Sequence, residues 1–259
     1  ERVEDALRAN RPRLIYTIPT FHNPTGTCLN SLRRRALLAL ADRYNVPILE
    51  DDFVGDLCYE DRAQPALKTL DPGGRVIYTS TFSKILLPAL RVGFLVASGP
   101  VLGQLMAHKQ TIDLGSDLMQ RALEAYITVG RYRSYLRRTC QEFRRRRDVM
   151  LAALSRYLPP ETRWLKPKGG LFIWLHLPGG ITAEEVYPLA REEGVTFLPG
   201  SVCFPGERPQ PYLRMNFTVH PPDVIEEGVR RLGRAIARCL ADRQEDGIPS
   251  PAEALAEGA

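Results

Sequence analysis

Short apolar runs alternate with helical patterns along the first part of the chain. Four runs have the length and composition of buried strands, at residues 13–18, 46–49, 76–79 and 92–97. Residues 31–44 carry leucine and alanine at helical spacing, which predicts a helix with one buried side. This alternation predicts an α/β domain with a mostly parallel, doubly wound sheet. Ligands of such sheets bind at the carboxyl ends of the strands.

The pattern becomes helical between residues 100 and 157 and then changes again. A strand pair is predicted over residues 164–177, and Thr182 followed by Glu185 is typical of a capping box at a helix start. Two more strands and a long amphipathic helix are predicted at 195–198, 212–218 and 222–239. The second half of the chain is therefore predicted to form a smaller α+β unit.

These patterns divide the chain into two domains and a tail. The predicted boundaries are 1–130 for part of a large domain, 131–240 for a small C-terminal domain with its linking helix, and 241–259 for a disordered tail. The first residue is Glu rather than Met, and the sheet follows the end of a helix. We therefore expect the sequence to be a fragment that lacks an N-terminal part.

Composition excludes several classes of protein. With 259 residues, 44% apolar and 25% charged, the chain is typical of a globular protein and not of a disordered, collagenous or disulfide-rich one. Its longest apolar stretches are shorter than the ~20 residues that cross a bilayer, and no signal-peptide pattern opens it. A cytoplasmic protein without membrane contact is expected. The five cysteines have no paired spacing, which favours reduced thiols and no metal site.

The charged residues limit which side chains can act as an amine nucleophile. The net charge of +5 is diffuse, and the run 144–147 lies in a helical pattern, which favours a solvated helix face over a nucleic-acid contact. Arginine cannot serve as an ordinary amine nucleophile. Among the 35 basic residues there are five lysines, so any lysine chemistry has few candidates.

Lys84 is the strongest of these candidates. It follows a predicted strand in the sequence Thr-Ser-Thr-Phe-Ser-Lys, and Arg91 lies seven residues later. A lysine amine forms an imine with a carbonyl compound, while hydroxyls and a guanidinium group bind phosphate. The pattern therefore predicts a site for a phosphorylated carbonyl compound. The alternative is a surface loop with a solvated lysine.

Three other residues carry comparable signals. Asp51 ends an apolar strand, where a carboxylate can pair with a protonated ring nitrogen, or it belongs to an acidic cap or turn. Asn23 opens the turn Asn-Pro-Thr-Gly just past a strand, where its amide can donate to a ring oxygen, although most such turns are only turns. Arg214 lies within an apolar strand and suits a bidentate grip on a carboxylate. A structural ion pair is the alternative for Arg214.

Together these residues resemble a known family, the fold-type I pyridoxal-phosphate aminotransferases. The motifs that carry the resemblance are Asn23-Pro24-Thr25-Gly26, Asp51, Thr81-Phe82-Ser83-Lys84 with Arg91, Pro167-Lys168-Gly169-Gly170 and Arg214. They occur in the order of the family and span about residues 13–239. The sequence is most similar to the branch of 2-aminoadipate and kynurenine aminotransferases and to the aminotransferase-like domains of MocR-type regulators of the GntR family.

The resemblance implies pyridoxal 5'-phosphate as the cofactor and a role for each motif. Lys84 would form the imine with the cofactor and transfer a proton during the reaction. The other expected contacts are Asp51 with the ring nitrogen, Asn23 with the phenolic oxygen, Thr81, Ser83 and Arg91 with the phosphate, and Arg214 with the α-carboxylate of the substrate. Gly169 and Gly170 would allow the backbone to approach the substrate closely.

The sequence departs from the family in two places. Many relatives have a tyrosine two or three residues after the aspartate, and here those positions are Phe53 and Val54. A hydrogen bond to the phenolic oxygen is therefore expected to be missing. The glycine- and serine-rich phosphate cradle and the aromatic residue that stacks on the ring are also absent from this sequence, which agrees with a fragment.

Three functions are compatible with these motifs. The first is an aminotransferase that exchanges an amino group between an amino acid and a 2-oxo acid and works as a homodimer. The second is the cofactor- and ligand-binding effector domain of a MocR-type transcription regulator, which would contact nucleic acid only if a winged helix precedes it. The third is another fold-type I reaction, such as β-elimination or decarboxylation, because the fold does not determine the reaction.

Overall fold

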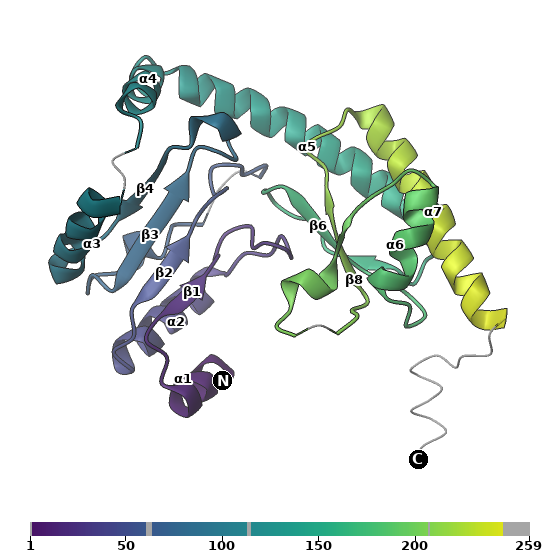
Figure 1. Cartoon of the computed structure of the whole chain (residues 1–259), viewed down its shortest axis with the longest axis horizontal. Coiled ribbons are helices and arrows are strands. Elements are labelled where there is room, and N and C mark those ends of the chain that lie inside the picture. The colour runs from purple at the N-terminus through teal and green to yellow at the C-terminus, as the bar shows by residue number, and fades with distance from the viewer. Residues whose placement is uncertain (1, 61–63, 113–114, 207, 246–259) are drawn as a thin grey trace. The chain divides into compact units, whose positions relative to one another are not determined.

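The structure, a computed structural model, describes residues 2–60, 64–112, 115–206 and 208–245 (Figure 1). The chain divides into two compact units, and each is described by itself. Unit 1 comprises Glu1–His22, Thr27–Cys140 and Lys168–Gly170, and unit 2 comprises Asn23–Gly26, Gln141–Pro167 and Leu171–Ala259. The division falls inside helix α5 (Arg131–Tyr157). The domain boundary at residue 130 remains a prediction.

Unit 1 is built on a four-stranded sheet with the order β1-β2-β3-β4. The strands are β1 (Ile15–Thr17), β2 (Ile48–Asp51), β3 (Val76–Thr81) and β4 (Gly93–Val96). The first three strands are parallel and β4 is antiparallel to β3. Each lies within or next to a run that predicts a strand, and the sheet is mostly parallel as expected.

The core of unit 1 lies on one face of this sheet. Helix α2 (Ser31–Arg43) packs there and begins at Asn30, whose side chain accepts a hydrogen bond from the backbone N–H of Arg33. The buried cluster on this face consists of Ala41, Ile48, Leu67 and Val76. Because side chains alternate along a strand, the residues between those of the cluster point to the opposite face.

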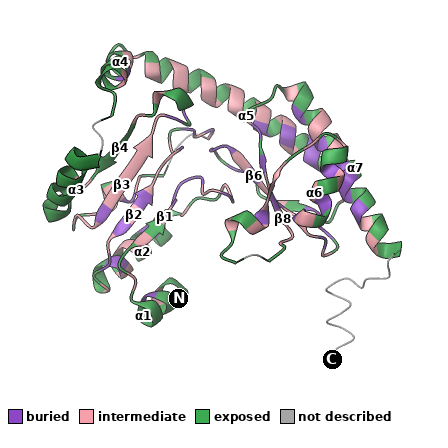
Figure 2. Ribbon diagram, viewed as in Figure 1, coloured by how far each residue is buried: buried purple, intermediate pink, exposed green. Residues whose placement is uncertain are grey.

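The remaining helices of unit 1 are short or lie near its surface. They are α1 (Arg2–Asn10), α3 (Gly99–Ile112), α4 (Asp117–Thr128) and the first turns of α5, with 3-10 turns at η1 (Lys68–Leu70) and η2 (Pro88–Leu90). No residue of α3 is buried, although the helix is rich in apolar side chains. Figure 2 shows most of this helix as exposed, and Leu105 is half-buried.

Unit 2 contains an antiparallel sheet with the order β5-β6-β8-β7. Its strands are β5 (Arg163–Trp164), β6 (Phe172–His176), β7 (Leu198–Pro199) and β8 (Tyr212–Asn216), and its further elements are α6 (Ala183–Glu192), η3 (Gly200–Cys203) and α7 (Pro222–Glu245). The inward side chains of β6 and β8, such as Leu175 and Leu213, are fully buried. Buried residues also line α7, which packs against α6 (Figure 2).

Several local predictions can be compared with this fold. The capping box of Thr182 and Glu185 is present at the start of α6. The strand pair predicted over residues 164–177 corresponds to the antiparallel pair β5 and β6, which begins one residue earlier, at Arg163. Helix α7 continues to Glu245, into the segment 241–259 for which a tail is predicted. Residues 246–259 lie outside the described residues. Of the helices in the described ranges, none combines the length and apolar character that a bilayer crossing requires.

Candidate functional site

Asp51 lies at the carboxyl end of β2, on the sheet face opposite α2. Burial alternates along the strand, because Ile48 and Glu50 are fully buried while Leu49 and Asp51 are half-buried. Tyr16 of β1 pairs in register with Leu49, so it shares a face with Asp51. Its hydroxyl donates a 2.7 Å hydrogen bond to Asp51 Oδ2. Desolvation and this hydrogen bond raise the pKa of Tyr16 to about 12.

The two acids that flank Asp51 have other partners. Glu50 accepts hydrogen bonds from the backbone N–H groups of Leu67 (2.8 Å) and Lys68 (2.9 Å), and its carboxylate lies 4.0 Å from the guanidinium of Arg34. Asp52 accepts from the Tyr78 hydroxyl at 2.8 Å. Burial raises the pKa of both carboxyl groups. Asp51 is therefore the acid of this cluster that faces away from the core.

Lys84 follows β3 at the same edge of the sheet. Strands β2 and β3 are parallel and Asp51 pairs with Thr79, so the residues that follow both strands leave the sheet on one side. The backbone N–H of Ser83 donates to Thr81 Oγ1 at 3.1 Å and closes a tight turn. Ser83 is buried and the Lys84 side chain is exposed. The amine is thus accessible next to the strand that carries Asp51.

Arg91 lies between η2 and β4 with a left-handed backbone, at φ 49° and ψ 30°. Non-glycine residues with this conformation are uncommon and concentrate at functional sites. Because Thr81 pairs with Gly93 at the start of β4, the backbone of Arg91 lies near the end of β3. Thr81, Ser83, Lys84 and Arg91 therefore belong to one end of the sheet in unit 1.

Asn23 and Arg214 come together within unit 2. The Arg214 guanidinium donates a 2.6 Å hydrogen bond to Asn23 Oδ1, and its central carbon lies 4.0 Å from the centroid of the Phe172 ring. Desolvation lowers the pKa of Arg214. Across the described ranges Arg214 takes part in no salt bridge, which argues against a structural ion pair. The Asn23 amide keeps its N–H donors for other acceptors.

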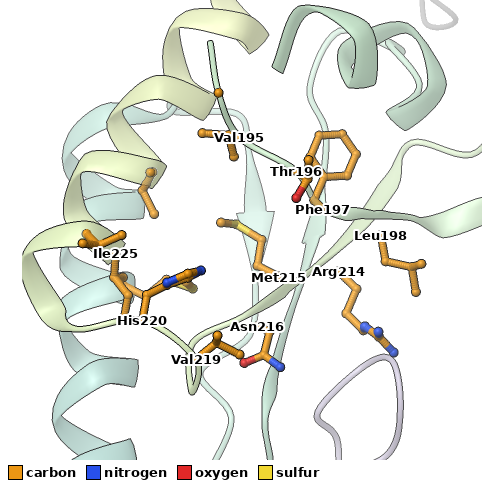
Figure 3. A pocket seen from close by; sticks show the side chains of 15 residues that line it. Val195, Thr196, Phe197, Leu198, Arg214, Met215, Asn216, Val219, His220 and Ile225 are labelled. Atoms are coloured by element: carbon orange, nitrogen blue, oxygen red, sulfur yellow. The ribbon is translucent and has the colours of Figure 1, made fainter. Parts of the chain in front are cut away.

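A cavity of about 340 Å³ adjoins β8, the strand of unit 2 that carries Arg214. Its wall consists mainly of apolar side chains, among them Met150, Phe197, Met215 and Ile225. Figure 3 shows Met215 directed toward Ile225, whereas its neighbour Arg214, which also lines the cavity, points to a different side of β8. The cavity has no local signal in the sequence, because its wall is assembled from segments that are far apart in the chain.

The glycines of the Pro-Lys-Gly-Gly motif are required by packing within unit 1. A Cβ atom on Gly169 would lie 2.2 Å from the Phe21 ring and 2.3 Å from the Leu57 carbonyl oxygen. Gly170 has a left-handed backbone at φ 74°, and its carbonyl accepts a hydrogen bond from the Tyr59 hydroxyl. Packing within unit 1 therefore requires glycine at both positions, in addition to the close approach to a substrate that the resemblance implies.

Two of the contacts in this region are not predicted from the sequence. Tyr16 is not among the candidate residues, although strand alternation and the parallel register would place it beside Asp51. Phe172 is also missed, because only the fold brings its ring under Arg214. Among the described residues, no group of three or more His, Cys, Asp or Glu side chains is arranged to hold a metal ion.

The sequence profile described as "Aminotransferase class I and II" matches residues 1–232. The chain belongs to this family. A curated relative from Thermococcus litoralis, "Aromatic-amino-acid aminotransferase 1", is 37% identical over 86% of this chain and 54% of its own length. A Bacillus subtilis protein described as "Uncharacterized HTH-type transcriptional regulator YdfD" is 33% identical over 91% of this chain and 49% of its own length.

The solved structures give the same result for the fold. The kynurenine aminotransferase of Pyrococcus horikoshii, in complex with PMP, KYN and KYA, superposes with a TM-score of 0.87 at 35% identity. The match covers 92% of this chain and 60% of that chain. The predicted fold class, a mostly parallel α/β sheet with a smaller α+β domain, is therefore confirmed. The chain spans about half to three fifths of the length of the relatives it matches.

Proposed function

We propose that the protein is a pyridoxal-phosphate-dependent aminotransferase that exchanges an amino group between an amino acid and a 2-oxo acid. The observation that carries the proposal is the position of Asp51 and Lys84 after neighbouring parallel strands, at one edge of the sheet in a chain of this family. Ligands of open α/β sheets bind at this edge. An accessible amine and a half-buried carboxylate there fit a cofactor that has an aldehyde and a ring nitrogen.

The residues of unit 1 fit pyridoxal phosphate on the face opposite α2. This face is open, since Tyr16 is 57% exposed and Leu95 is 41% exposed. Asp51 would hold the ring nitrogen, and the hydroxyls of Thr81 and Ser83 with Arg91 would hold the phosphate. Bound there, the cofactor supplies an electron sink for the negative charge that develops at the substrate α-carbon.

Two side chains of unit 1 prepare this chemistry. Asp51 would pair with the ring nitrogen, and the hydrogen bond that it accepts from Tyr16 fixes the direction of its carboxylate. Lys84 would carry the proton between the substrate α-carbon and the cofactor, because its amine is attached to a short turn at the strand end. Both roles depend on the fixed position of these groups.

Arg214 would bind the α-carboxylate of the amino acid. A guanidinium group has five N–H donors, and one of them is used by Asn23. The remaining donors suit a bidentate contact with a carboxylate, while the Phe172 ring supports the group from one side. The relatives named for aromatic amino acids and for kynurenine support an amino acid as the substrate. Homodimer formation and a cytoplasmic location remain predictions from the resemblance.

A second candidate function is supported by the similarity to the regulator YdfD. In that case the same residues would bind the cofactor and an amino compound without turnover. The two functions differ in a simple assay, because an aminotransferase converts an amino donor and a 2-oxo acid continuously. A regulator domain would bind the amino compound without producing a new 2-oxo acid.

The test of the proposal is the visible absorption band of cofactor linked to a lysine. The purified protein mixed with pyridoxal phosphate should show this band, and Lys84→Ala should abolish it because no other lysine lies at the strand end. Lys109→Ala is the matched control, since Lys109 is an exposed lysine of α3. A band that persists in Lys84→Ala, or that is absent from the unmodified protein, would refute the assignment.

A further inference from the structure

The first turns of α5 contact the turn that carries Lys84 on both sides of the lysine, at Phe82 and at Leu86. The Tyr135 hydroxyl donates a 3.3 Å hydrogen bond to the carbonyl oxygen of Leu86. The Tyr132 ring packs edge-on against Phe82, with ring centroids 5.8 Å apart and an interplanar angle of 77°. Lys84 lies midway between Phe82 and Leu86. All of these residues belong to unit 1.

The backbone of this turn is closed on itself. The N–H of Leu86 donates to the carbonyl of Phe82 at 2.9 Å, and the N–H of Phe82 donates to the carbonyl of Val92 at 3.0 Å. Phe82 also lies 5.8 Å from the ring of Phe94 on β4. The turn is therefore closed by its own hydrogen bonds, and α5 contacts it on both sides of Lys84.

Tyr132 also contacts the segment that follows Asp51. Its hydroxyl donates a 2.6 Å hydrogen bond to Asp56 Oδ2, and Asp56 lies five residues after Asp51. The backbone carbonyl of Asp56 accepts a second contact from the Cys140 thiol of the same helix, at 3.6 Å. One side chain thus touches the segment after β2 with its hydroxyl and the turn after β3 with its ring.

We infer that Tyr132 is a positioning residue that sets Lys84 relative to Asp51, with Tyr135 as a second support of the same turn. The inference rests on the proposed function, because it assigns a purpose to the distance between these two groups. Neither tyrosine is described in contact with Lys84 or Asp51, so each acts through the segment that it holds. Desolvation and Asp56 raise the pKa of Tyr132, which keeps its hydroxyl protonated as a donor.

The phenylalanine variant separates positioning from packing. Tyr132→Phe keeps the ring against Phe82 and removes only the hydrogen bond to Asp56. Misplacement of a reacting group by about 1 Å costs up to about a hundredfold in rate. We expect kcat to fall about tenfold with little change in KM, and the lysine-linked absorption band to weaken, while the thermal unfolding temperature changes little.

The matched control lies at the other end of the same helix. Tyr157 also donates a hydrogen bond to a carboxylate, at 3.0 Å to Glu226 Oε1, but in unit 2. Tyr157→Phe therefore removes the same chemical group from α5 and should leave kcat and the band unchanged. Asp56→Asn keeps an acceptor for the Tyr132 hydroxyl and should retain most of the activity.

A double-mutant cycle completes the test. Because Tyr132 and Asp56 act as a pair, Tyr132→Phe combined with Asp56→Ala should lose no more activity than Asp56→Ala alone. A Tyr132→Phe variant with unchanged kcat and band would overturn the inference, and so would equal losses in Tyr132→Phe and Tyr157→Phe. If the unmodified protein shows no lysine-linked band, the proposed function itself fails instead.

Discussion

The two units bury their apolar residues to very different degrees. In unit 2 the inward residues of β6 and β8 and a whole side of α7 are buried, including Leu213, Leu232 and Ile236 at 0% exposure. In unit 1 the cluster between α2 and the sheet is buried, together with residues such as Phe21, Leu57 and Ile85. Every residue of β4 is exposed, however, and α3 has no buried residue. Exposed apolar side chains that gather on neighbouring elements mark interaction surfaces.

The unit with the larger core is not the unit that carries most of the proposed cofactor contacts. Unit 2 has the larger core, yet four of the proposed cofactor contacts, together with Lys84, belong to unit 1. Elements with few buried contacts open at lower free energy than a core does. Unit 1 also contains specific polar contacts, such as those of Arg34 and Tyr132, which add to its apolar packing.

The largest expected effect tests whether unit 1 depends on a buried charge. Arg34 is fully buried and donates to the carbonyl oxygens of Leu29, Pro65 and Pro19 and to Thr20. Arg34→Ala leaves these acceptors and the Glu50 carboxylate without their cation. The free energy of unfolding should fall by about 3–5 kcal/mol.

Chemical denaturation of Arg34→Ala measures this loss, and Arg35→Ala supplies the control. Arg35 is an exposed neighbour on the same helix, so its removal should change stability by less than about 0.5 kcal/mol. Equal effects of the two variants would mean that the buried guanidinium does not stabilise unit 1.

A smaller effect should distinguish the sheets of the two units. Leu213→Ala in β8 removes a fully buried side chain and should cost about 3 kcal/mol. Leu95→Ala in β4 removes a side chain that is 41% exposed and should cost less than 1 kcal/mol. The shift of the unfolding midpoint with denaturant measures both. A large loss in Leu95→Ala would show that the open face of unit 1 is packed in solution.

The smallest effect concerns alkaline pH. The folded chain holds the Tyr16 proton up to about pH 12, whereas an unfolded tyrosine releases it near its ordinary pKa of 10.0. The free energy of unfolding should therefore decline as the pH rises from 10.0 to about 12. Because Tyr16 is largely exposed, solvent screening keeps this contribution small.

Tyr16→Phe has no proton to release, so its stability should decline less steeply over the same pH interval. The other tyrosines are common to both proteins and cancel in the difference. Denaturant midpoints of both proteins across the interval provide the measurement. Parallel pH profiles would mean that the hydrogen bond between Tyr16 and Asp51 does not form in solution.

The sequence predicts the elements of both units because their signals are local. Strand runs, the spacing in α2 and the capping box at Thr182 each depend on neighbouring residues. The alternation along residues 46–51 also predicts that Asp51 and Glu50 point to different faces, which agrees with their burial. Motif order was sufficient to name the family without any knowledge of contacts.

The contacts around the site could not be predicted in the same way. Tyr132 and Asp56 are 76 residues apart, and Asn23 and Arg214 are 191 residues apart. No periodicity links residues at such distances, because only the packing of whole elements brings them together. The burial of Arg34 is equally hidden, since it lies in a run of three arginines of which the two neighbours are exposed.

The alternation along β2 also limits which insertions this strand accepts. Adding one residue before Glu50 would turn its carboxylate toward the open face and direct Asp51 into the apolar layer under α2, where Leu67 and Val76 lie. Adding two residues would restore both directions, but it would move both carboxylates about 7 Å along the strand. Asp51 would then lose its contact with Tyr16, and Glu50 its contacts with Leu67 and Lys68, so this end of the strand should tolerate neither insertion.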